Sequence, residues 1–94
     1  MSFRQIITIT TLEGRSEEFA AAAKERMEAV KVEPGCLQFE IFRSLQRPEV
    51  FAIHERWVDQ AAWEHHEELN KPRGQMGAGT RKPDPIRERY ITEE

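Results

Sequence analysis

The residues of this sequence best suited to chemistry are a histidine, a glutamate and a tryptophan on two neighbouring predicted elements. His66 lies in a helical pattern, while Glu55 and Trp57 lie two residues apart in a strand-like pattern. Imidazole has an ordinary pKa near neutral pH, so His66 can take up and release a proton. A glutamate among apolar neighbours is costly to bury unpaired. We therefore expect His66 to approach Glu55, either as a general base or as a structural partner that orders its helix.

Glu55 has other candidate partners, and Trp57 has two interpretations. Three arginines, Arg56, Arg87 and Arg89, could form a structural ion pair with Glu55. An indole can stack against a flat ring, although a tryptophan is also a common core residue. The sequence leaves both choices open.

Two further histidines, His54 and His65, raise the question of a metal site. Adjacent residues of a helix point to different faces, so His65 diverges from His66. The sequence contains no pair of histidines four residues apart and only one cysteine, Cys36. Metal sites in proteins need several converging ligands. The pattern therefore predicts no metal.

The elements that must position these residues follow from hydrophobic periodicity. Alternating apolar residues are typical of strands, and apolar residues three or four apart are typical of helices. Ser16 and Asp59 are suited to cap helices at their first turn. The expected order is a strand over 3–12, a helix from 16 to before Pro34, strands over 36–45 and 50–57, a helix over 60–70 and a strand over 86–92. This β-α-β-β-α-β order predicts an α+β, ferredoxin-like fold, with a four-stranded antiparallel sheet and helices on one face.

Residues 71–85 interrupt this pattern. They contain three of the five glycines and three of the five prolines. We expect them to form a mobile loop, either disordered or a lid in which Met76 covers a pocket while Arg73, Arg81 and Lys82 meet an anion.

Length and charge bound the remaining possibilities. The chain has 94 residues, which is one domain over 1–94, and a formal net charge of −3. This charge disfavours nucleic acid as a partner, and no apolar run approaches the roughly 20 residues that span a membrane. The N-terminus lacks a signal-peptide pattern, so we expect a cytoplasmic protein. A small core and an uncovered sheet face favour a homodimer.

Several short motifs, taken in order, resemble a known family. Glu33-Pro34-Gly35-Cys36-Leu37 precedes a strand, and Phe51-x-x-x-Glu55-x-Trp57-x-Asp59 is followed by two alanines and then His66. This series is similar to the antibiotic biosynthesis monooxygenases, a group of small dimeric α/β-barrel proteins. The similarity covers roughly residues 3 to 66 and, in outline, the last strand. The chain departs from the family's usual pattern after the histidine and at His54, where an aromatic residue is usual.

The resemblance implies a homodimer that oxidises a small aromatic or quinol-like compound with O2 and without metal, flavin or haem. It also implies that His66, Glu55 and Trp57 are the catalytic positions. Three alternatives stay open: an isomerase-like enzyme on the same fold that uses His66 as its base, a non-catalytic dimer that binds a small ligand, and a haem-degrading relative. The last is the least favoured, because such proteins carry an asparagine on the first strand, where this chain has only Gln5.

Overall fold

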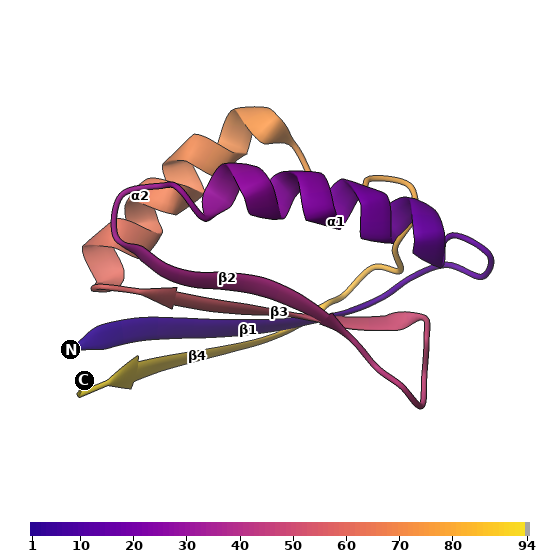
Figure 1. Cartoon of the computed structure of the whole chain (residues 1–94), viewed down its shortest axis with the longest axis horizontal. Coiled ribbons are helices and arrows are strands. Elements are labelled where there is room, and N and C mark those ends of the chain that lie inside the picture. The colour runs from indigo at the N-terminus through magenta and orange to yellow at the C-terminus, as the bar shows by residue number, and fades with distance from the viewer. Residues whose placement is uncertain (94) are drawn as a thin grey trace.

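The structure is a sheet of four strands covered on one face by two helices (Figure 1). It is a computed structural model that describes residues 1–93, so the last residue of the predicted domain lies outside the described part. The elements in chain order are β1 (Ser2–Thr10), α1 (Ser16–Val30), β2 (Cys36–Arg43), β3 (Val50–Trp57), α2 (Gln60–Asn70), a 3-10 turn η1 (Lys71–Arg73) and β4 (Ile86–Thr92). The predicted ferredoxin-like arrangement is confirmed.

The sheet is antiparallel throughout, with strand order β2-β3-β1-β4. β1 is therefore an inner strand. Its register places Gln5 opposite Glu55 on β3 and opposite Arg89 on β4. Two residues further along β1, Ile7 lies opposite Ile53 and Arg87. Alternate residues of a strand share a face, so all of these side chains point to the same face of the sheet.

The core fills the space between this face and the helices. On α1, Phe19, Ala23 and Val30 form a buried stripe, and Met27 packs against it. Opposite the stripe, buried side chains come from all the strands except β4: Phe3, Ile7, Ile9, Phe39, Phe51, Ile53 and Trp57. The core thus forms one continuous layer, and the polar residues described below are set into it.

The ends of the predicted elements differ from the structure in three places. Ser16 is not the N-cap of α1; Arg15 holds that position without a side-chain hydrogen bond, and the Ser16 hydroxyl lies 2.6 Å from the Thr11 hydroxyl instead. β1 ends at Thr10 and β2 at Arg43, so both strands are shorter than expected. Leu37 and Leu45 are exposed, because the register shifts between Cys36 and Gln38 and because Leu45 lies beyond the strand.

The second helix begins as predicted. The Asp59 carboxylate accepts a hydrogen bond of 2.8 Å from the backbone N–H of Ala62. Ahead of it in the chain, Gly35 has φ +78°, a backbone conformation that side chains disfavour. A Cβ atom at Gly35 would lie 2.6 Å from the Cβ atom of Ala62. The turn that joins α1 to β2 therefore rests directly on α2.

The segment 71–85 starts with the turn η1 and has no regular helix between residues 74 and 79. Met76 is buried in the core cluster, and Thr80 is buried beside it. Arg81 forms an isolated β-bridge with Thr11. The segment thus packs against the core at these points, while its mobility stays a prediction.

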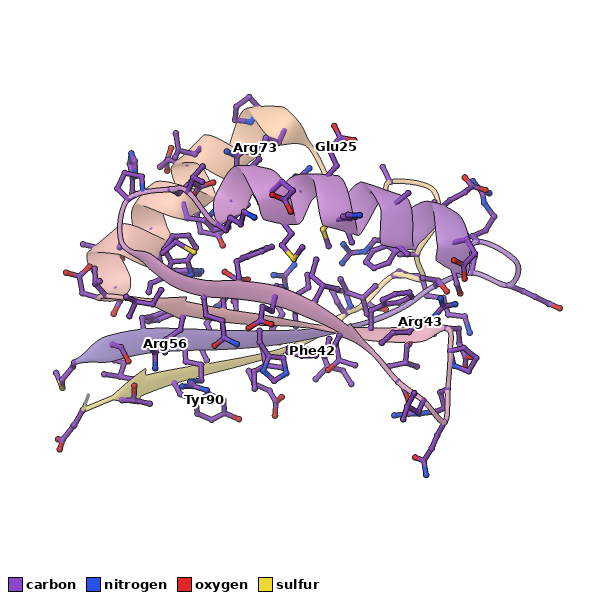
Figure 2. The ribbon with its side chains drawn as sticks, in the orientation of Figure 1. Glu25, Phe42, Arg43, Arg56, Arg73 and Tyr90 are labelled. Atoms are coloured by element: carbon purple, nitrogen blue, oxygen red, sulfur yellow. The ribbon has the colours of Figure 1, made fainter. Side chains whose placement is uncertain are left out.

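The opposite face of the sheet carries no helix. Figure 2 shows Phe42, Arg56 and Tyr90 pointing away from the two helices. Phe42 and Tyr90 are 47% and 46% exposed, and the Phe42 ring meets the His54 ring edge to face at 5.0 Å. A partly apolar, uncovered sheet face is therefore present, as the strand pattern predicted. Within residues 1–93, no helix is long and apolar enough to cross a membrane.

Candidate functional site

Glu55 is a buried carboxyl group on the core face of β3, only 2% exposed. Its two oxygens accept one hydrogen bond each, from Gln5 Nε2 at 2.9 Å and from Trp57 Nε1 at 3.1 Å. Burial raises the pKa of Glu55, while these two hydrogen bonds and the nearby His66 act in the opposite direction. The donors are neutral, so they stabilise the ionised form less than an arginine would. Glu55 is thus a buried carboxyl group whose pKa lies above its ordinary value.

His66 lies over Glu55 from α2 and is 3% exposed. Its Nδ1 atom lies 2.8 Å from Glu33 Oε1, and its Nε2 atom lies 4.0 Å from Glu55 Oε1. The imidazole stacks on the Trp57 indole, with 4.7 Å between ring centroids. A carboxylate can only accept a hydrogen bond, so Nδ1 must carry the proton. In the neutral ring, the lone pair is then on Nε2, on the side of Glu55.

Glu33 is the partner of His66 that the sequence did not reveal. It is 8% exposed and lies in the turn between α1 and β2. Its second oxygen accepts a hydrogen bond of 2.6 Å from Arg73 Nη1 in η1. The carboxylate therefore bridges α2 and η1 and carries a compensating cation. The only signal in the sequence was its place immediately before Pro34-Gly35, in a motif used for the family resemblance but not for chemistry.

Gln5 connects Glu55 to the edge of the sheet. Its side chain is fully buried, and its Oε1 atom accepts a hydrogen bond of 2.7 Å from Arg89 Nε. The Arg89 guanidinium also lies over the Trp63 ring, 4.9 Å from its centroid. Because Arg89 fixes which end of the Gln5 amide accepts, the amide nitrogen must face Glu55. These hydrogen bonds depend on which strands pair with β1, and the residue pattern of a single strand does not show that pairing.

A cavity of about 150 Å³ opens beside Glu55 and His66. Its lining mixes apolar residues, most of them from the sheet, with charged residues from the sheet, both helices and the loop. The residues that line it are Ile7, Ile9, Arg26, Phe39, Ile53, Glu55, His66, Glu67, Asn70, Gly74, Gln75, Met76, Arg81 and Arg87. The site therefore combines a histidine, a carboxyl group and an apolar wall large enough for a small molecule.

The structure brings the three predicted site residues together but corrects their pairing. His66 forms its hydrogen bond with Glu33, not with Glu55. Arg89 reaches Gln5 instead of Glu55, and no arginine lies within ion-pair distance of Glu55 in residues 1–93. Trp57 is fully buried and does not line the cavity. Its indole thus supports His66 and Glu55 and is not a stacking surface for a ligand.

Other predicted polar residues lie away from this cavity. His54 is on the uncovered face of the sheet and His65 is exposed on α2. Of the two loop arginines that were expected to meet an anion, Arg73 is paired with Glu33 and Arg81 lines the cavity. In the part of the chain that the structure describes, no three histidine, cysteine or acidic side chains group closely enough to hold a metal ion.

The arrangement can move a proton between buried groups. His66 lines the cavity, its Nδ1 atom is held by Glu33, and its Nε2 atom lies on the side of Glu55. Protonation of Nε2 creates an imidazolium between two carboxyl groups, Glu33 and Glu55. A negative charge on either group attracts the charged ring.

Comparison with solved structures agrees with this fold. A conserved protein from Methanosarcina mazei Go1 is 18% identical, with a TM-score of 0.88 over 99% of this chain and 94% of that chain. Rv0793 from Mycobacterium tuberculosis is 15% identical, with a TM-score of 0.84 over 100% and 97%. PA3566 from Pseudomonas aeruginosa is 23% identical, with a TM-score of 0.82 over 99% and 95%. At these identities the likeness is one of fold.

Comparison at the level of sequence gives one family. No curated protein matches the chain. The sequence model of the antibiotic biosynthesis monooxygenases matches residues 2–71, which include β1, both helices and every residue of the Glu33, Glu55, Trp57 and His66 group. On this match, the chain belongs to the antibiotic biosynthesis monooxygenase family.

Proposed function

We propose that this protein is a cofactor-independent monooxygenase that oxidises a small phenol or quinol with O2. The observation that carries the proposal is the pair formed by Glu33 and His66. Glu33 holds Nδ1 at 2.8 Å, so Nε2 is free to accept a proton beside a cavity of about 150 Å³. A phenol becomes a much better electron donor when it is ionised, so removal of its proton prepares it to react with O2. Membership of the family is consistent with this chemistry.

The proposed reaction begins with transfer of the substrate hydroxyl proton to Nε2 of His66. The phenolate then gives one electron to O2, and the resulting phenoxyl radical and superoxide combine at a ring carbon. The new C–O bond belongs to a peroxide, which takes up a proton. That ring carbon loses its hydrogen as a proton while the O–O bond breaks, and hydroxide leaves with a proton as water.

Overall, these reaction steps convert one phenol and one O2 into one quinone and one water. The ring supplies all four electrons, so no further reductant is consumed. In this scheme His66 acts as base and then as acid, because it returns the proton to the peroxide or to the leaving hydroxide. Glu55 stabilises the imidazolium from 4.0 Å, and Trp57 holds both groups in place through its ring and its N–H.

We further propose that the protein is a homodimer closed through the sheet face that carries Phe42 and Tyr90. Dimers are typical of this family, and the face is partly apolar and uncovered. Two copies packed face to face would bury these side chains on both.

Oxygen uptake with a panel of phenols and quinols tests the proposed reaction. We expect uptake with at least one compound, and a loss of roughly 10²- to 10⁴-fold in His66→Ala, the usual range for a general base. His65→Ala is the matched control, since His65 is its exposed neighbour, and it should retain activity. Equal losses in the two variants, or no uptake with any compound, would contradict the proposal. Turnover that persists without O2 would favour the isomerase-like alternative, and binding without turnover the ligand-binding dimer.

A further inference from the structure

The charged side of the cavity has a feature that the proposed oxidation does not use. Two arginines, Arg81 and Arg87, line it close to each other, and each lacks a carboxylate within 4.0 Å in residues 1–93. The Nε atom of Arg81 is buried and makes no hydrogen bond, and its Nη1 atom donates only to the Met76 carbonyl, at 3.2 Å. Buried donors are normally satisfied, so a cavity-lining arginine that has an unused donor is suited to bind an acceptor in that cavity.

Electrostatics point to the same conclusion. Burial, and secondly the charge of Arg87, lower the pKa of Arg81, so the two guanidinium groups repel each other. Arg26 adds a third cation to the lining, with its own donors on Asn70 and on two backbone carbonyls. An anion between Arg81 and Arg87 would relieve the repulsion and accept hydrogen bonds from both. Carboxylates suit this position, because their two oxygens match the donor geometry of guanidinium groups.

The distance from this pair to the proton-transfer site can be read from the strand register. Arg87 lies opposite Ile7 on β1, and Gln5, two residues away, lies opposite Glu55. Two residues of a strand span about 7 Å, and because β4 and β3 lie on either side of β1, two strand spacings of about 5 Å each add to this separation across the sheet. Between the two ends the wall is apolar and consists of Ile7, Ile9 and Ile53.

The size of the cavity limits the ring system. A cavity of about 150 Å³ holds a molecule the size of benzene. It is too small for several fused rings unless the loop over it moves. The apolar wall would contact the ring, and charged groups would meet substituents at its two ends.

We propose that the cavity takes a single-ring phenol with a carboxylate substituent, its carboxylate held between Arg81 and Arg87 and its hydroxyl facing His66. The placement of the hydroxyl rests on the proposed function, while the recognition of the carboxylate does not. The two acidic groups of the lining, Glu55 and Glu67, would repel a carboxylate placed at the other end of the cavity. They therefore favour this one orientation.

Calorimetry without O2 tests this proposal independently of turnover. The probes are 2,5-dihydroxybenzoate, its methyl ester and hydroquinone, with wild type, Arg81→Gln, Arg87→Gln and Arg47→Gln. Arg47 is an exposed arginine in the turn between β2 and β3, so its variant controls for the loss of one positive charge. A hydrogen bond to a charged group contributes about 1.5–3 kcal/mol, which is roughly a 10- to 150-fold change in Kd.

We expect 2,5-dihydroxybenzoate to bind more tightly than its ester, and Arg81→Gln to weaken it by at least about 10-fold. Hydroquinone and the ester should change little in that variant, and Arg47→Gln should bind as wild type does. Arg87→Gln covers the case in which Arg81→Gln fails to fold, since Arg87 lies exposed on the edge strand β4. Equal binding of acid and ester, or equal effects of Arg81 and Arg47, would overturn the proposal. Carboxylate-selective binding without O2 uptake would uphold it and refute only the oxidation.

Discussion

Glu33→Gln is the substitution that most sharply separates a catalytic pair from a structural one. It preserves the size of the side chain but removes the charge that accepts from His66 Nδ1 and from Arg73 Nη1. The amide can offer only one oxygen, so one of the two donors is left without an acceptor. It can also present its own N–H to Nδ1, which would place the imidazole proton on Nε2, where the base needs a lone pair.

The size of the effect follows from the contact that is lost. A hydrogen bond to a charged group contributes about 1.5–3 kcal/mol, and about 1.4 kcal/mol corresponds to a factor of 10 in rate. If this energy stabilises the imidazolium formed during proton transfer, kcat/KM should fall by roughly 10- to 150-fold. The matched control is Glu68→Gln, which removes one negative charge from an exposed glutamate of α2.

Steady-state kinetics of both variants, with the double variant Glu33→Gln/His66→Ala, measure this effect. We expect Glu68→Gln to retain wild-type kcat/KM. The double variant should be no slower than His66→Ala alone, since Glu33 acts only through the imidazole. If Glu33→Gln keeps full activity, or if the losses of the two single variants simply add, Glu33 does not act through His66 and the reasoning is wrong.

Three further predictions concern folding, charge and assembly. In urea denaturation, Gly35→Ala should lower the free energy of unfolding by about 1–3 kcal/mol more than Gly14→Ala does. Both glycines have positive φ, but only Gly35 touches α2. Equal losses in the two variants would refute the contact. Between pH 4.5, the ordinary value for a glutamate, and the raised pKa of Glu55, the folded state binds more protons than the unfolded state, so stability should fall as pH rises. Thermal melts of Glu55→Gln should lack that slope, and a slope unchanged from wild type would exclude Glu55 as its source. Sedimentation should show a dimer at micromolar concentration that Phe42→Asp dissociates, and a monomeric wild type would disprove the sheet-face dimer.

The elements of this fold could be predicted because each carries its own periodic pattern. Burial against one layer requires an apolar residue at each buried position. This requirement produces the alternation along residues 50–57 and the stripe of Phe19, Ala23 and Val30 on α1. The sequence-based predictions were wrong at the ends of elements, where alternative local hydrogen bonds and registers compete. Ser16 bonds to Thr11 instead of capping α1, and the register shift near Cys36 turns Leu37 outward.

The site was predictable in its members but not in its pairing. His66, Glu55 and Trp57 have residue types that stand out against apolar neighbours, so the sequence identifies them. Their partners depend on which segments the fold brings together. Glu33 reaches His66 because Gly35 lets the turn rest on α2, and no local pattern records a contact across 33 residues. For the same reason Arg89 could not be assigned to Gln5 before the strand order was known.

The central claim is that Nε2 of His66 takes the proton of a phenol bound in the cavity. The most direct measurement is the absorbance of bound 4-nitrophenol, whose phenolate absorbs at a longer wavelength than the phenol. At a pH below the pKa of free 4-nitrophenol, wild type should produce the phenolate band on binding, and His66→Ala should bind the compound without it. A band of equal intensity in both proteins, or bound phenol with no phenolate band in wild type, would contradict the account.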